Sequence, residues 1–350
     1  MNSLPGVRDI RISPGGPGNL TVNITDVNAL QVSSVKDYGE PCIRKHSAII
    51  LATVIGFSAF CAALPAAVAQ GNDGNSPDVQ DGGTLSVLTY NVAGLPDIAS
   101  SSDVPRGPAT EEIGRRIADY DVVTVQEDFN YHAHLYRYNE HPHRSPTSGG
   151  AGIGSGLNQL SRHSWTGYDR VTWDDCHIGS GDCLAPKGFT VSQFELDDGV
   201  VVDLYNLHAD AGSTDRDIAA RRANLEQLAE YLRTHSADRP VIVAGDTNTR
   251  YTRTGDRIAE FADDLGLTDA WVETRRDGIR PTEGSDALVC DEGNPGNDCE
   301  VVDKILFRGS EDIEIDVTDF GNVESEFRTD DNAQLSDHYP ISAELTWRRK

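Results

Sequence analysis

Short apolar runs that end in polar residues are the feature that most limits how this chain can fold. Val122–Val125 and Val241–Ala244 consist of β-branched residues and alanine, and both are too short for buried helices. Such runs predict strands covered on both faces. Further strand-like runs occur at Leu85–Val92, Val301–Phe307, Ile313–Val317 and Ile341–Trp347. We therefore expect strands at the centre of the fold.

Helices and one hairpin accompany these strands. Phe189–Leu196 and Val200–Leu207 flank an Asp-Asp-Gly turn, which predicts an antiparallel hairpin. Apolar residues at helical spacing predict helices at Thr110–Tyr120, Ile218–Leu232 and Ile258–Leu265. Hairpins mixed with helices are typical of two packed sheets with helices outside them. We expect one α/β domain over residues 84–350.

The N-terminal part predicts an export signal. A basic flank at Arg44–His46 precedes an apolar run at Ser47–Leu64, and Ala67–Ala69 follows with the small-x-small pattern of a cleavage site. We expect cleavage after Ala69, so that residues 1–69 are removed, with residues 70–83 as a flexible lead-in. A membrane anchor is the alternative. Translation from Val35 would leave a signal peptide of normal length.

Four cysteines remain after that cleavage. They allow three disulfide pairings, and closure of short loops favours Cys176–Cys183 and Cys290–Cys299. An even number of cysteines fits a secreted protein in an oxidising compartment, and neither pair has the spacing of a zinc site.

The formal net charge of −26 bears on partners. An acidic chain repels polyanions, so we expect no stable nucleic-acid partner, although bound divalent cations can reverse the field at a site. The charge also suits simple solubility.

Polar residues follow the predicted strands where a core strand needs none. Carboxylate and amide oxygens are ligands for a hard cation such as Mg²⁺, and an Asp-His pair can move a proton near neutral pH. Strands that repeatedly end this way predict a shared cleft at one edge of the sheets. The residues are Asn91, Glu127, His208, Asp246, Asn248, Asp337 and His338.

The order of these motifs resembles the endonuclease/exonuclease/phosphatase superfamily. The tracts TYN, QE, NLH, GDTN, VDKI and SDHYP occur in that order between about Leu85 and Trp347. The resemblance implies a four-layer sandwich, in which two mixed sheets pack face to face between helices. It also implies metal-assisted hydrolysis of a phosphoester.

The resemblance further assigns the metal ligands. Glu127 would be the principal ligand, with Asn91 and Asp337 beside it. Mg²⁺ is the expected ion, with Mn²⁺ and Ca²⁺ as alternatives. A turn residue is the structural alternative for Asn91.

The resemblance assigns the catalytic roles as well. His208 and Asn248 would bind phosphate oxygens, and Asp246 would position a proton-transfer partner or the leaving group. His338 would be the general base, oriented by Asp303. A turn cap for Asp246 and an ion pair for Asp303 remain structural alternatives.

The branch within the superfamily rests on fewer residues. Ala93 stands where abasic-site enzymes commonly have Asp. The Lys187-Gly188 pair before an apolar strand resembles both neutral sphingomyelinases and inositol-polyphosphate 5-phosphatases, and the segment Ser155–Arg162 resembles sphingomyelinases. Lys187 would bind phosphate or a head group, or would be an ordinary lysine at a strand start.

We therefore expect a secreted, monomeric, sphingomyelinase-like phosphodiesterase that touches membranes transiently. Trp165, Tyr168 and Trp173 are the best aromatic candidates for such a contact, although acidic residues adjoin them. An inositol-phosphate or other small-molecule phosphatase, a secreted nuclease and a binding module without catalysis are the alternatives.

Overall fold

The computed structural model describes residues 10–15, 19–24, 81–149, 153–291, 293 and 295–350. The chain divides into two units, Met1–Asn72 and Asp73–Lys350. In the first unit, β1 (Ile10–Gly15) pairs antiparallel with β2 (Asn19–Ile24). The predicted signal peptide and its cleavage site lie outside the described residues. Within the described part, none of the helices has the length and apolar character needed to span a bilayer.

The second unit contains two six-stranded sheets. In order across the first sheet, the strands are β13 (Ile313–Asn322), β14 (Ile341–Arg349), β3 (Gly82–Asn91), β4 (Val122–Gln126), β6 (Asn158–Ser161) and β5 (His143–Arg144). In the second sheet, they are β11 (Thr268–Asp269), β12 (Asp303–Arg308), β10 (Val241–Asp246), β9 (Val200–Leu207), β8 (Gly188–Asp197) and β7 (Trp165–Thr172). The pairs β3–β4 and β9–β10 are parallel and the others antiparallel, so both sheets are mixed.

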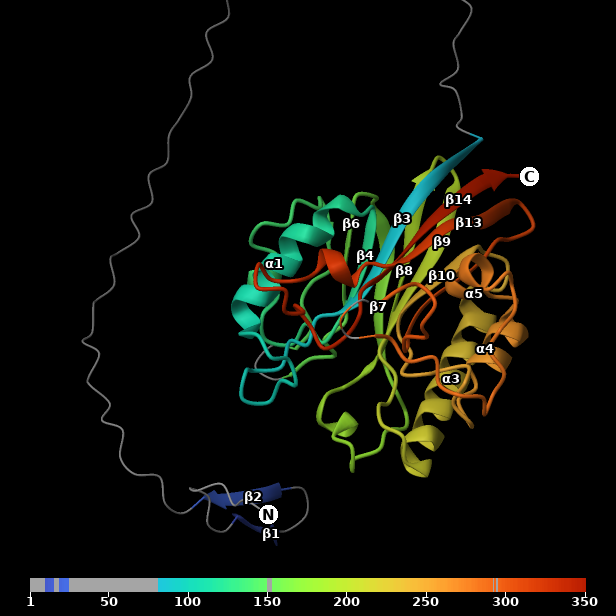
Figure 1. The fold of residues 1–350 in the computed structure, drawn as a ribbon. Helices are drawn as coiled ribbons and strands as arrows, with labels where there is room; N and C mark the ends of the chain where they lie inside the picture. Colours follow the sequence, from blue (N-terminus) through green and yellow to red (C-terminus); the bar gives the residue numbers. More distant parts are fainter. Residues whose placement is uncertain (1–9, 16–18, 25–80, 150–152, 292, 294) are drawn as a thin grey trace, which may run out of the picture. The chain divides into compact units, whose positions relative to one another are not determined.

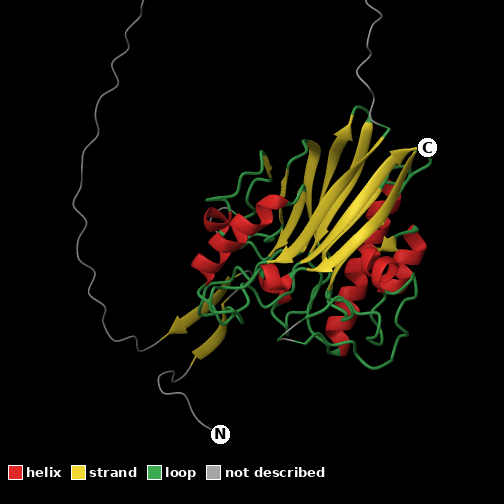
Figure 2. Ribbon diagram, turned by 45° about the horizontal axis from the view of Figure 1, so that its top comes forward, coloured by secondary structure: helices red, strands yellow, loops and turns green. Residues whose placement is uncertain are grey.

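Helices lie on the outer sides of the two sheets (Figures 1 and 2). They are α1 (Arg106–Arg116), α2 (His132–Leu135), α3 (Asp215–His235), α4 (Ile258–Leu265) and α5 (Ala270–Arg275), with 3₁₀ turns η1 (Ile117–Asp119), η2 (Asp182–Leu184) and η3 (Glu324–Glu326). The predicted four-layer α/β sandwich is therefore confirmed.

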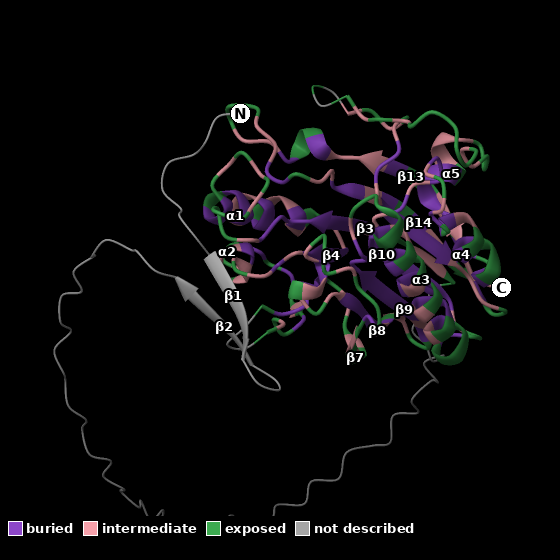
Figure 3. Cartoon of the chain, turned by 90° about the horizontal axis from the view of Figure 1, so that it is seen from below, coloured by how far each residue is buried: buried purple, intermediate pink, exposed green. Residues whose placement is uncertain are grey.

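Alternation along β3 explains the layering. Leu85 and Val87 belong to the large core cluster that includes the second sheet, α3 and α4. Leu88 and Tyr90 point the other way and pack with Ile113 of α1. Successive side chains of a strand face opposite sides, so one strand serves both the space between the sheets and the helix layer. Figure 3 shows these central strands as buried.

The interface between the sheets also contains polar contacts. Gln126 at the end of β4 donates to Asn206 Oδ1 of β9 at 2.7 Å, and Asn206 donates to the Val125 carbonyl at 3.0 Å. Thr124 donates to the Ala244 carbonyl at 3.1 Å. These side chains are fully buried, and their partnered polar groups fix the register of one sheet on the other.

Two helices begin earlier in the chain than predicted. The helix predicted at Ile218–Leu232 begins at Asp215, because Thr214 and Asp217 form a reciprocal capping box. The helix predicted from Thr110 begins at Arg106, directly after Pro105. Ile258–Leu265 is helical as predicted.

Both predicted disulfides are present. Cys176 bonds to Cys183, and Cys290 bonds to Cys299. The aromatic side chains predicted to contact a membrane are not well exposed: Trp173 is 8% exposed, and Trp165 and Tyr168 are half-buried on β7. Trp173 is therefore too buried for that contact, because it packs against Phe189, whereas Trp165 packs against Phe194 of the neighbouring strand and keeps part of its surface exposed.

Candidate functional site

The site forms where strands of both sheets end. β3 and β4 run parallel, so Asn91 and the residue after Gln126 lie at the same edge of the first sheet. The Asn91 amide donates to Glu127 Oε1 at 3.1 Å and to Asp246 Oδ2 at 3.1 Å. Because Asp246 ends β10 of the second sheet, this one amide joins the two sheets at the site.

Two of the predicted site residues have a strained backbone conformation. Glu127 has φ 58° and Asn248 has φ 52°, a region that non-glycine residues rarely adopt. Backbone strain of this kind often accompanies functional side chains. Gly94 allows the close approach, because a Cβ there would collide with the Glu127 carbonyl. The strand therefore ends abruptly and turns the Glu127 carboxylate toward Asn91.

His208 lies between Asp246 and Lys187. Its Nε2 is 3.3 Å from Asp246 Oδ2 and 2.9 Å from Lys187 Nζ, and Lys187 also bonds to Asp182. Burial, aided by the positive charges of Lys187 and His338, holds the pKa of His208 well below its usual value. His208 is therefore neutral at neutral pH and can exchange hydrogen bonds with a bound phosphate.

His338 pairs with two carboxylates. Its Nδ1 is 3.1 Å from Asp303 Oδ2, and its Nε2 is 3.7 Å from Asp246 Oδ2. Burial alone would lower the pKa of His338, but the charges of Asp303 and Asp246 outweigh it and raise that pKa to about 10. Asp303 thus contacts one nitrogen of the imidazole, and the other nitrogen, Nε2, faces Asp246.

The carboxylates that converge here, Glu127, Asp246, Asp303 and Asp337, outnumber the positive charges of Lys187 and His338. Burial raises the pKa of Glu127, while the Asn91 amide and the charges of Lys187 and His338 oppose that rise. Burial likewise raises the pKa of Asp246. Charge of this kind is costly without a counterion, so the oxygen-rich donor set fits a divalent cation.

Two groups of side chains could hold that cation. Ligand atoms of Asp246, Asp303 and His338 lie within 4.8 Å of one another. Glu127 and Asn91 form the other group. The exposed Asp337 adds to it through its charge, which acts on the pKa of Glu127.

Asn248 completes the edge of the site. Its backbone N–H donates to Asp246 Oδ1 at 3.0 Å, and its side-chain amide donates to the Ala209 carbonyl at 3.1 Å. The loop after β10 is therefore held against the end of β9. The predicted site residues thus lie in one connected set of contacts, except for Asp337, whose carboxylate accepts from Ser101 and Ser336 instead.

Sequence reasoning missed three residues that shape this set. Asp182 binds Lys187, Ser336 donates to the Asn91 carbonyl at 2.7 Å, and Arg106 donates to the carbonyls on both sides of the site. Asp182 lies five residues before Lys187, in a loop whose path depends on the disulfide. Arg106 and Ser336 act through backbone carbonyls, which carry no pattern in the sequence.

One protein family matches part of this chain. Residues 110–277 match the model of Endonuclease/Exonuclease/phosphatase family 2. Residues 110–277 therefore contain the sequence pattern of this family, and the two-sheet fold agrees with that match.

A comparison with individual proteins is more specific than the family match. The chain is 36% identical over 332 residues to a sphingomyelinase of Mycobacterium tuberculosis, covering 93% of this chain and 62% of that protein. The chain thus spans less than two thirds of the length of this relative.

Solved structures share the fold at low identity. Beta toxin from Staphylococcus aureus with bound magnesium ions is 15% identical, with a TM-score of 0.52, covering 75% of this chain and 99% of that one. D. rerio TDP2 complexed with a single-strand DNA product is 17% identical, with a TM-score of 0.55 and coverage of 75% and 98%.

Proposed function

We propose that this protein is a divalent-metal-dependent phosphoester hydrolase, and more specifically a sphingomyelinase-like phosphodiesterase. One observation carries the proposal: a single amide, Asn91, bonds to carboxylates from both sheets, Glu127 and Asp246, beside two histidines. The 36% identity to a sphingomyelinase over nearly the whole chain supports the choice of substrate.

Each side chain of the site has a separate role in the proposed hydrolysis. His338 takes a proton from the attacking water, and Asp303 keeps its imidazole in position. His208 and Asn248 hydrogen-bond the phosphate oxygens, and Lys187 adds a positive charge beside His208. Asp246 lies between the two histidines, where it positions a proton-transfer partner or the leaving group.

The bound cation would be held by Glu127, Asn91 and Asp337, with Mg²⁺ as the expected ion. It would neutralise phosphate charge and, by compensating the nearby carboxylates, lower the pKa of His338 from about 10 into the range of a base. Export, cleavage after Ala69 and a monomeric state are parts of the same proposal. The two disulfides support an oxidising compartment.

A nuclease is the second candidate, and one observation favours it. The fold is shared with D. rerio TDP2, whose structure holds a single-strand DNA product. The net charge of −26 argues against it, because that charge repels a polyanion along its length. An inositol-phosphate phosphatase remains the small-molecule alternative.

A substrate panel tests the proposal. The purified protein is given sphingomyelin in detergent micelles, inositol phosphates, plasmid DNA and a chromogenic diester, each with Mg²⁺, Mn²⁺, Ca²⁺ or a chelator. We expect choline phosphate release that requires a divalent cation, and its loss in Glu127→Gln. Nicked plasmid without choline phosphate would select the nuclease, and turnover in chelator would contradict the metal site.

A further inference from the structure

Three aliphatic side chains protrude from loops at the site end of the sheets. Ile98, in the loop after β3, is 98% exposed, and Ile178 and Leu184, in the loop between β7 and β8, are 74% and 75% exposed. Both loops project from the same end of the sheets (Figure 1). The other large apolar side chains exposed in the described residues are Tyr138, Ile153, Ile279 and Val289.

Both loops are bonded directly to the site. Ser101, three residues after Ile98, donates to Asp337. Asp182, two residues before Leu184, binds Lys187, which contacts His208. These aliphatic side chains therefore belong to the rim of the site.

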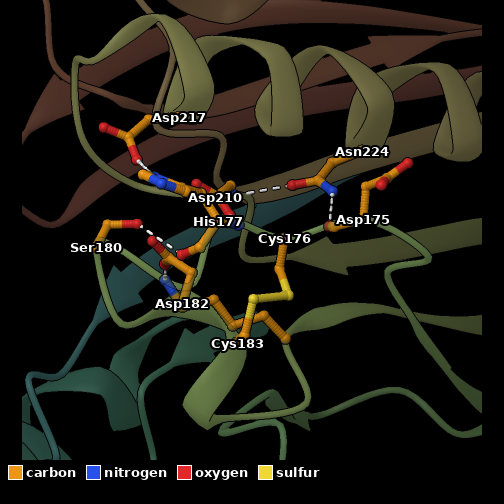
Figure 4. Close-up of a disulfide and its surroundings, with 10 residues drawn as sticks. Asp175, Cys176, His177, Ser180, Asp182, Cys183, Asp210, Asp217 and Asn224 are labelled. Atoms are coloured by element: carbon orange, nitrogen blue, oxygen red, sulfur yellow. Dashed lines mark hydrogen bonds and ion pairs between the residues drawn. A yellow bond between two sulfur atoms is a disulfide. The ribbon is translucent and has the colours of Figure 1, made fainter.

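A disulfide and several hydrogen bonds hold the second loop in place. The Cys176–Cys183 disulfide closes it, and His177 has two further contacts: its N–H donates to Asp210, before α3, at 2.7 Å, and its ring is 2.5 Å from Asp217 in the first turn of α3 (Figure 4). Asn224 of α3 donates to the Asp175 carbonyl at 2.9 Å. A braced loop that exposes two aliphatic residues is preorganised to bury them against a partner.

The charges around these residues indicate the partner. Asp97 and Asp103 flank Ile98, and Asp174 and Asp175 precede Ile178; all four are exposed. An anionic membrane would repel this rim, and the net charge of −26 adds to the repulsion. A zwitterionic bilayer offers apolar depth without that repulsion.

We propose that Ile98, Ile178 and Leu184 form a docking rim that inserts into the surface of a zwitterionic phospholipid bilayer and brings the site to the head groups. This inference rests on the proposed function, because a lipid substrate is what gives the docking its use. The rim replaces the aromatic residues Trp165, Tyr168 and Trp173, which the fold buries in whole or in part.

The test separates docking from chemistry. Flotation with phosphatidylcholine–sphingomyelin vesicles, in chelator so that no turnover occurs, is measured for the wild type and for Ile98→Ser/Ile178→Ser/Leu184→Ser. A matched control, Tyr138→Ser/Ile279→Ser, removes exposed apolar surface outside these two loops. Burial of an aliphatic side chain is favourable enough that losing three should weaken vesicle binding at least about tenfold. Hydrolysis of vesicle sphingomyelin should fall in parallel, while hydrolysis of a soluble chromogenic diester stays unchanged.

Each outcome has one meaning. Equal vesicle binding by the triple variant and the wild type, or an equal loss in the control, overturns the docking rim. Stronger binding to vesicles containing phosphatidylglycerol overturns the choice of a zwitterionic surface. If the wild type fails to hydrolyse sphingomyelin in detergent micelles, the proposed function fails, whatever the vesicles show.

Discussion

Arg106 positions backbone on both sides of the site although it touches none of the predicted catalytic groups. It is fully buried, and its guanidinium donates to the Val92 carbonyl at 2.6 Å, the Ala93 carbonyl at 2.9 Å and the Leu335 carbonyl at 2.8 Å. These carbonyls adjoin Asn91 on one side and the segment leading to His338 on the other. One planar group thus sets the distance between two parts of the site.

We expect Arg106→Lys to lower kcat for the chromogenic diester by about 100-fold with little change in KM, because a lysine nitrogen cannot reach all three carbonyls and small displacements in a site are costly. Arg106→Met should also lower the free energy of unfolding by ~3 kcal/mol, since it leaves buried carbonyls without partners. Steady-state kinetics and denaturant unfolding measure the two effects. A Lys variant with normal kcat would show that Arg106 serves only stability.

Asp128, directly after Glu127, carries a titration that should be visible in stability. Burial raises its pKa to about 7, against the opposing bond from Asn158 and the charge of Arg170. A carboxyl whose folded pKa lies above its unfolded value near 3.8 reduces stability as pH rises from about 4 to about 7. Its second oxygen has no hydrogen-bond partner among the described residues.

We therefore expect Asp128→Asn to gain stability relative to the wild type as pH rises from 4 to 8, by up to a few kcal/mol at ~1.4 kcal/mol for each pKa unit. The amide oxygen can still accept the 2.7 Å bond from Asn158. Unfolding midpoints of both proteins across that range give the difference, in which the other titrating groups cancel. A difference independent of pH would mean that Asp128 is ionised in the folded protein at pH 4.

At the scale of elements, the central strands could be predicted and the connections could not. Val122–Val125 and Val241–Ala244 are strands because continuous β-branched runs leave few alternatives, and their polar ends placed Glu127 and Asp246 correctly at one edge. β7 escaped prediction, because its exposure shows no regular alternation and its register with β8 shifts at a bulge. Loops such as the one that carries Asp182 are fixed by long-range contacts, which no local pattern encodes.

The loop between β7 and β8 gives the prediction at this scale. Cys176→Ala/Cys183→Ala should lower kcat/KM for the diester about tenfold, because Asp182 would no longer hold Lys187 against His208. Cys290→Ala/Cys299→Ala is the matched control. The two bridges have sequence separations of 7 and 9, so both pairs of substitutions should cost about 2 kcal/mol of stability. Equal losses of activity in both variants would contradict a specific role for the first disulfide.

For the whole molecule, the motif order predicted the sandwich, and motifs at strand ends need only the topology of the sheets to lie close together. Asp246 and His338 lie 92 positions apart in the sequence, yet their side chains are 3.7 Å apart. The polar contacts between the sheets were not predicted, since the positions of Gln126 and Asn206 at strand ends fit a role in the site as well as a role in joining the sheets. Their mutual bond shows that part of the motif serves the joining of the sheets.

Net charge acts on the molecule as a whole and opposes compactness. A charge of −26 creates self-repulsion that salt screens, and the Debye length falls from about 10 Å at 0.1 M to about 3 Å at 1 M. Salt also screens the exposed ion pairs, but each of these is worth only ~0–1 kcal/mol, so the repulsion should dominate.

We expect Tm at pH 7.5 to rise by several degrees between 0.1 and about 1 M NaCl, at ~2–4 °C for each kcal/mol of added stability. Near the isoelectric point of about 4.6 the rise should vanish, and sucrose at matched osmolality should act equally at both pH values. A Tm that falls with salt at pH 7.5 would mean that attractive pairs outweigh the excess of negative charge.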